Sequence, residues 1–167
     1  MIKNAPQFLP LIKKNLRVSL EGIHGIRHWE RVYRIGSVLS NRTGADLQIV
    51  QAFAWVHDAR RYTDGSDPGH GKRGAIFARQ INDRFLHLTT DQLDTLCIAC
   101  TSHSRGDTSV NPTVGTCWDA DRLDLARLSI EPDLGMLSTA AARDEEFVCW
   151  ACSLSDSSFI GFNRAKV

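Results

Sequence analysis

An apolar run that ends in a histidine and an aspartate is the feature that most limits what this chain can fold into. Eight of the ten residues from Leu47 to Val56 are apolar, and His57 and Asp58 follow at once. The run is too long and too uniform for an alternating strand, so it predicts a core helix. At helical spacing His57 falls on the stripe of Phe53 and Val50, which directs its ring along the buried face. A carboxylate at that end needs a cation or strong donors, because burying it unpaired costs several kcal/mol.

Length and charge set the broad class of the protein. The 167 residues predict one domain, with a motif-bearing core at about 20–130 and a C-terminal helix and tail at about 131–167. Lys and Arg number 20 against 19 Asp and Glu, so the formal net charge is +1. A charge this close to zero gives no electrostatic reason to expect nucleic acid or an anionic membrane as the main partner. Residues 1–19 lack the apolar core of a signal peptide, and no run approaches the length of a membrane span. We therefore expect a soluble, cytoplasmic protein.

Helical periodicity recurs along the chain and no strand pattern competes with it, so the predicted fold class is all-α, a bundle of about six to seven helices. Polar, glycine-rich stretches at 60–69 and 104–115 are predicted as loops. Gly71 and Gly74 are expected to let the backbone approach a ligand closely. The pair Thr89 and Gln92 predicts a capping box. The expected helices cover about 7–19, 28–41, 47–56, 70–85, 89–103, 115–128 and 132–154, followed by a serine-rich tail.

The apolar stripes of these helices begin or end in metal-binding residue types. One such histidine is more often a satisfied core residue than a ligand, but five separately buried polar groups would cost more than one shared metal centre. Asp121 shares the face of Trp118 and Leu125, whereas Asp119 and Arg122 point elsewhere. Mixed nitrogen and oxygen ligands suit one or two divalent ions of Mn, Fe, Ni, Co, Mg or Zn. The candidate ligands are His28, His57, Asp58, His70, His103 and Asp121.

Five cysteines include the two pairs Cys97-x-x-Cys100 and Cys149-x-x-Cys152. Together they could form a four-thiolate zinc site, but such pairs usually lie on turns and these fall in apolar helical segments. Free cysteine is among the most buried residue types. We expect core packing, with zinc binding as the alternative.

The ordered motifs resemble those of the HD-domain superfamily of metal-dependent phosphohydrolases, in particular the small bacterial HD hydrolases. The similarity rests on His24-Gly-Ile-Arg-His28-Trp-Glu-Arg-Val, Val56-His57-Asp58, Thr101-Ser102-His103-Ser104 and Asp119-Ala-Asp-Arg-Leu-Asp124. The resemblance implies that His28, His57, Asp58 and Asp121 form the core single-metal set. It implies that His70 and His103 match the ligands of a second metal in binuclear members.

The resemblance also implies an activity: hydrolysis of a small phosphate ester, most plausibly a nucleotide, by a metal-activated water that Asp58 or Asp121 orients. Arg61 stands where some HD nucleotidases carry Glu and signalling phosphodiesterases carry Lys. We expect Arg61 to be catalytic and to bind phosphate, with further phosphate contacts from Arg60, Lys72 and Arg73, although these four could equally form a solvated loop face. The alternatives are an HD-fold di-iron oxygenase and a non-catalytic metal-binding regulatory module.

Overall fold

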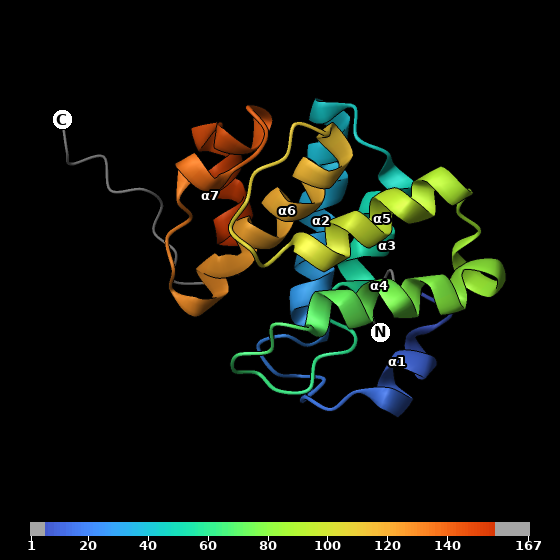
Figure 1. The fold of residues 1–167 in the computed structure, drawn as a ribbon. Coiled ribbons are helices and arrows are strands. Elements are labelled where there is room, and N and C mark those ends of the chain that lie inside the picture. Colours follow the sequence, from blue (N-terminus) through green and yellow to red (C-terminus); the bar gives the residue numbers. More distant parts are fainter. Residues whose placement is uncertain (1–5, 156–167) are drawn as a thin grey trace.

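A computed structural model describes residues 6–155, and within that range helices joined by loops are the only secondary structure (Figure 1). The predicted all-α class is confirmed, with seven α-helices in the described residues. They are α1 (Leu9–Asn15), α2 (Ile26–Thr43), α3 (Leu47–Val56), α4 (His70–Ile81), α5 (Thr90–Ser102), α6 (Pro112–Leu123) and α7 (Glu145–Ser153). Shorter helical turns occupy Asn82–Leu86, Asp124–Leu128, Leu134–Met136 and Ala141–Arg143.

Helix α3 is the centre of the bundle. It packs against α2, α4, α5 and α6, while α4 also packs on α5 and α2 on α6. Seven of its ten residues are buried, as its apolar composition requires. The Asp46 side chain caps the helix by accepting hydrogen bonds from the backbone N–H groups of Gln48 and Ile49. At the other end His57 directly follows the last helical residue, so the polar pair emerges where four neighbouring helices meet.

Two glycines let α4 lie against its neighbours. A Cβ atom on Gly74 would lie 2.6 Å from the carbonyl oxygen of Val56, and one on Gly71 would lie 2.2 Å from that of Cys100. The glycines therefore allow close contact between helices, and not the close approach to a ligand that the sequence suggested. They allow the backbone of α4 to approach the ends of α3 and α5, which carry His57 and His103.

The predicted helix at 132–154 is wrong. Only α7 is α-helical there, preceded by two short 3-10 turns. The backbone between them is bound by side chains instead: Asp119 accepts hydrogen bonds from the N–H groups of Ser138 and Thr139, and Arg143 donates to the Leu137 carbonyl. Because these side chains satisfy backbone groups that a helix would pair internally, the segment stays non-helical.

Several other helix boundaries differ from those predicted. Helix α1 is confined to Leu9–Asn15, because Leu16 adopts an extended conformation. The stripe predicted to reach Phe85 leaves the α-helix at Ile81 and continues as a π turn. Helix α6 starts three residues before Gly115 because Asn111 caps it, whereas the predicted capping box of Thr89 and Gln92 is confirmed.

Among the described residues no helix is long and apolar enough to cross a bilayer. The predicted serine-rich tail falls largely outside the described range, as do residues 1–5.

The thiols lie in helical, apolar surroundings. Cys97, Cys100, Cys117 and Cys152 are buried and Cys149 is half-buried. Burial raises the pKa of the Cys100 and Cys117 thiols well above the ordinary value, and Cys97 Sγ donates to the Ala75 carbonyl. The groups of described residues that could hold a metal ion contain histidine and aspartate only.

We expect simultaneous replacement of Cys97 and Cys149 by Ala to leave the metal content of the protein unchanged. The double variant should lose about 1 kcal/mol of unfolding free energy per site, because each truncation leaves a small cavity. Elemental analysis and urea unfolding measure the two quantities. Loss of one ion per chain would show that the thiolates do hold zinc.

Candidate metal centre

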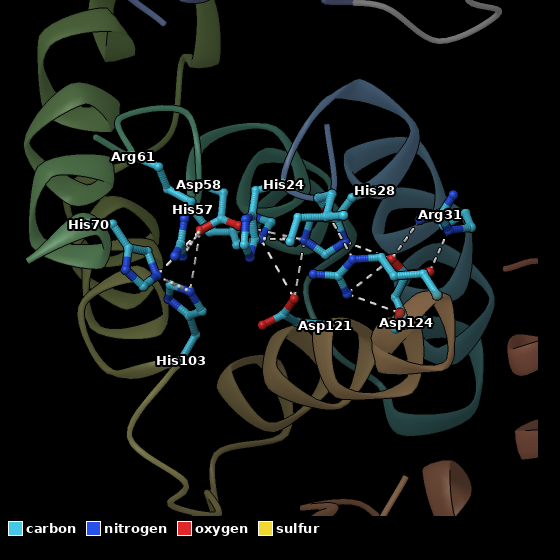
Figure 2. Close-up of polar contacts among 12 residues, drawn as sticks. His24, His28, Arg31, His57, Asp58, Arg61, His70, His103, Asp121 and Asp124 are labelled. Atoms are coloured by element: carbon cyan, nitrogen blue, oxygen red, sulfur yellow. Dashed lines mark hydrogen bonds and ion pairs between the residues drawn. The ribbon is translucent and has the colours of Figure 1, made fainter. Parts of the chain in front are cut away.

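Six polar side chains from the ends of five helices meet in one buried cluster (Figure 2). His28 lies in the first turn of α2, and His70 is the first residue of α4. His57 and His103 immediately follow α3 and α5, and Asp58 comes next after His57. Asp121 belongs to the last turn of α6. The structure thus brings together all six residues that the sequence nominates as ligands.

Four ligand atoms form the first half of the cluster. The Nε2 atoms of His28 and His57 lie 3.1 Å apart. Asp121 Oδ1 is 3.3 Å from the first nitrogen and 3.7 Å from the second, and Asp58 Oδ2 is 3.8 and 3.7 Å from them. Ligands about 2.1 Å from a common ion lie about 3 to 3.4 Å from one another. The spacing of the four atoms therefore fits a single divalent ion with small adjustments.

The other oxygen of Asp58 faces the second half. His70 Nε2 and His103 Nε2 are 2.8 Å apart, and Asp58 Oδ1 lies 3.3 and 3.8 Å from them. One carboxylate thus turns one oxygen to each pair of imidazoles. Such a donor set would allow the cluster to hold one ion or two neighbouring ions.

The outer nitrogen of each ring fixes its tautomer. The Nδ1 atom of His57 faces the Phe53 carbonyl at 3.0 Å, that of His103 the Cys100 carbonyl at 2.7 Å, and that of His70 the Asp67 carbonyl. A carbonyl only accepts, so these Nδ1 atoms carry the proton and the Nε2 atoms present lone pairs. Lone pairs of this kind facing one another at about 3 Å repel unless a cation lies between them. The donor set therefore fits a metal, and its members would hold it through Nε2.

The electrostatics of the cluster also call for positive charge. Burial lowers the pKa of His57 to about 4, so its ring is neutral at pH 7. Burial also opposes charge on His28 and His103, yet hydrogen bonds to the Asp carboxylates raise the pKa of both. Although burial would raise the pKa of Asp58, the neighbouring histidines hold it well below the ordinary value. Two buried carboxylates attract cations, and either protons or metal ions can meet that demand.

Asp124 is a functional residue that the sequence analysis did not assign. It is fully buried, and its Oδ2 atom lies 2.6 Å from Nδ1 of His28. Arg31 Nε donates to its other oxygen at 2.5 Å, and Ser155 Oγ donates to that same oxygen at 2.9 Å. Its place three residues after Asp121, one helical turn on, was the available signal. A carboxylate behind a ligand histidine orients the ring and makes it a stronger donor to metal.

A cavity of about 390 Å³ opens from the cluster. His70, His103, Asp58 and Asp121 line its base, and Arg61, Arg122 and Arg127 supply positive charge to its walls. The predicted loop 104–115 contributes Ser104 and Gly106. The segment 130–136 also lines the cavity, and most of it falls in the stretch that was predicted to be helical from 132 onward.

Only one of the four predicted phosphate-binding residues lies in the cavity. Arg61 lines the cavity, is 7% exposed, and donates to the Gly65 carbonyl and to Asp58 Oδ1 at 3.4 Å. Arg60 instead lies over the Phe77 ring, and Arg73 pairs with Asp67. Lys72 is exposed on α4. None of these last three lines the cavity, so the geometry gives Arg60, Lys72 and Arg73 no place in the candidate site.

His24, the first residue of the His24-Gly-Ile-Arg-His28 motif, lines the cavity as well. Its Nδ1 atom is 2.9 Å from Asp64 Oδ1, which ties the chain before α2 to the loop after α3.

Substitution of the two neighbouring aspartates of α6 should give opposite results. We expect Asp121→Ala to empty the site, because its Oδ1 atom contacts both His28 and His57. Asp119→Ala should keep the metal but lower the melting temperature, because Asp119 binds the backbone at Ser138 and Thr139. Elemental analysis and thermal unfolding measure the two effects. Equal metal loss in both variants would contradict the assignment of Asp121.

Metal content should also fall sharply in His57→Ala and Asp58→Ala, which lie where the two halves of the cluster meet. Full metal content in both variants would show that the centre lies elsewhere.

The Asp124→Asn variant should lose stability in a pH-dependent manner. Burial opposes the charged form of Asp124, but His28 and Arg31 outweigh it and lower its pKa below the ordinary 3.8. The charged carboxylate therefore stabilises the folded state above that pH, and this stabilisation is lost as the pH falls through its folded pKa. We expect a loss of about 3 kcal/mol at pH 7 that shrinks at acid pH. Urea unfolding with chelator at several pH values measures it; a pH-independent difference would contradict it.

Comparison with known proteins supports one relationship. No family model matches the sequence, and no curated protein is significantly similar to it. A solved structure with the same fold is the crystal structure of a predicted HD superfamily hydrolase from an uncultured Thermotogales bacterium. It is 26% identical to this chain, with a TM-score of 0.65 over 88% of this chain and 84% of that one. Its fold, together with the ordered histidines and aspartates converging at one centre, supports the HD-domain superfamily as the family of this chain.

Proposed function

We propose that this protein is a metal-dependent phosphohydrolase whose substrate is a small phosphate ester, specifically a nucleotide. The observation that carries the proposal is the position of the cluster: four of its six candidate ligands, His70, His103, Asp58 and Asp121, line the base of a cavity whose walls hold three arginines. An ion at the base and guanidinium groups beside it are the features that phosphoryl groups require. The similar Thermotogales protein, described as a predicted hydrolase, supports metal-dependent hydrolysis in general.

One or two divalent ions held by His28, His57, Asp58, His70, His103 and Asp121 would supply an acidified water as nucleophile and positive charge for the phosphoryl oxygens. The protein side chains contribute orientation. Asp58 Oδ2 and Asp121 Oδ1 both face the Nε2 atoms of His28 and His57, and either carboxylate can accept a proton from water. Arg61 lies beside Asp58 and uses its Nε, Nη1 and Nη2 atoms for contacts within the protein, and it keeps further N–H groups for a phosphate.

The rest of the cavity suits an organic leaving group. Leu125, Ile130, Pro132 and Met136 line it, and Ile130 and Met136 are 48% and 36% exposed. Apolar side chains exposed at the mouth of a polar site favour a substrate with a flat or apolar part, such as a nucleobase. This is the support for a nucleotide over a small sugar phosphate.

We expect the metal-loaded protein to release phosphate from a panel of nucleotides and other phosphate esters. Chelator should abolish turnover, and Mn²⁺ or another divalent ion should restore it. In labelled water the label should enter the released phosphate, whereas an oxygenase would consume dioxygen and a regulatory module would do neither. Absence of hydrolysis of both phosphomonoesters and phosphodiesters with Mn, Fe, Ni, Co, Mg and Zn would contradict the proposal.

Arg61→Ala provides a matched test of the phosphate contact, with Lys72→Ala as its control. Arg61 lines the cavity and Lys72, on the neighbouring helix, does not. The Arg61 variant should raise KM or lower kcat about tenfold or more while it retains metal. The Lys72 variant should behave as the wild type. Equal activity of the two variants would remove Arg61 from the site.

A further inference from the structure

The four ligand histidines are not held equally firmly. His57 and His103 each donate from Nδ1 to a carbonyl of the helical turn that precedes them, and His28 faces the buried Asp124. His70 instead begins α4, so no helical turn precedes it. Its Nδ1 acceptor is the carbonyl of Asp67, which belongs to the loop before the helix. The orientation of this one ring therefore depends on the conformation of a loop.

An ion pair fixes that loop at the residue concerned. Arg73 Nη2 lies 2.5 Å from both carboxylate oxygens of Asp67, and the Tyr62 N–H donates to Asp67 Oδ2 at 2.7 Å. The Asp67 side chain is 7% exposed and the Arg73 side chain 24%, so the pair is partly shielded from solvent. The carbonyl of the same residue accepts from both the backbone N–H and Nδ1 of His70.

Arg73 is itself fixed on several sides. Its Nε atom donates to the Arg60 carbonyl at 2.9 Å, and its guanidinium lies 3.8 Å from the centre of the Tyr62 ring. A Cβ atom on Gly69 would lie 2.7 Å from Nη1 of Arg73, so the guanidinium packs directly against the turn before His70. The charge that the sequence analysis assigned to phosphate thus joins the loop to α4.

We infer that the Asp67–Arg73 pair is a positioning device: it fixes the ring of His70 and thereby sets the affinity of the second metal position, formed by His70, His103 and Asp58. The inference rests on the metal centre of the proposed function, but it does not depend on the reaction or the substrate. It predicts that the two halves of the ligand cluster bind metal with unequal affinity. The His28, His57, Asp58 and Asp121 half is held by helices and a buried carboxylate, whereas the second half depends on one loop. A ligand held by such an outer contact loses about tenfold to 100-fold in metal affinity when the contact is removed.

The test is Mn²⁺ titration of chelator-treated full-length protein, followed by electron paramagnetic resonance and elemental analysis. Arg73→Gln removes one partner of the pair. Its matched control is Arg79→Gln, the same change on the same helix, where Arg79 pairs with Asp94 at an exposed position. His70→Ala gives the signal of a protein without the second position. Asp67→Asn tests the pair from the other side if Arg73→Gln folds poorly.

We expect wild type and Arg79→Gln to bind two ions and to show the spectrum of a coupled Mn²⁺ pair. Arg73→Gln and Asp67→Asn should keep the first ion at wild-type affinity, bind the second about tenfold to 100-fold more weakly and lose the coupled spectrum at equal Mn²⁺. The inference fails if the second ion binds these variants as tightly as wild type, or if both ions weaken equally. It also fails if wild type binds one ion only, an outcome that leaves single-metal hydrolysis intact. Absence of phosphate release from a protein that shows these titrations would overturn the proposed function and not the positioning role.

Discussion

The sharing of Asp58 between two pairs of imidazoles is the interaction on which the rest of the site depends. Its Oδ2 atom faces His28 and His57, and its Oδ1 atom faces His70 and His103. A carboxylate in this position, 3% exposed, is stable only if positive charge surrounds it. The four helices that carry the histidines therefore each have one terminus at this carboxylate: α2 and α4 begin there, and α3 and α5 end there.

Helix α3 makes this arrangement possible because it is buried along its length and exposes its polar end to the cluster. Gly71 and Gly74 bring α4 against the ends of α3 and α5, where larger residues would separate the ligand histidines. On the other side Asp124 connects α2 to the end of α6 through His28 and Arg31. Core packing and the chemistry of the centre are thus carried by the same helix ends.

The ligand set and the cavity walls bear on different aspects of function. The ligand set explains why a metal should bind and why hydrolysis is the expected class of reaction. The walls of the cavity come from Ser104 and Gly106, from the 130–136 segment and from three arginines. Arg122 donates to the backbone carbonyls of Asp107 and Met136 and so joins the two segments.

The sequence by itself determined the helical class, the central core helix and the six residues that converge. Apolar periodicity fixes which face of a helix is buried, and the motif order identifies the residues at the helix ends. Tertiary structure alone decided which charged residues lie in the cavity. Arg60, Lys72 and Arg73 are cations that follow the His-Asp pair in the chain, as Arg61 is, yet Arg60 packs on Phe77, Lys72 faces solvent and Arg73 pairs with Asp67. The roles of Asp124 and of 130–136 were hidden for the same reason, because a long-range hydrogen bond and a loop held by side chains leave no periodic pattern in the sequence.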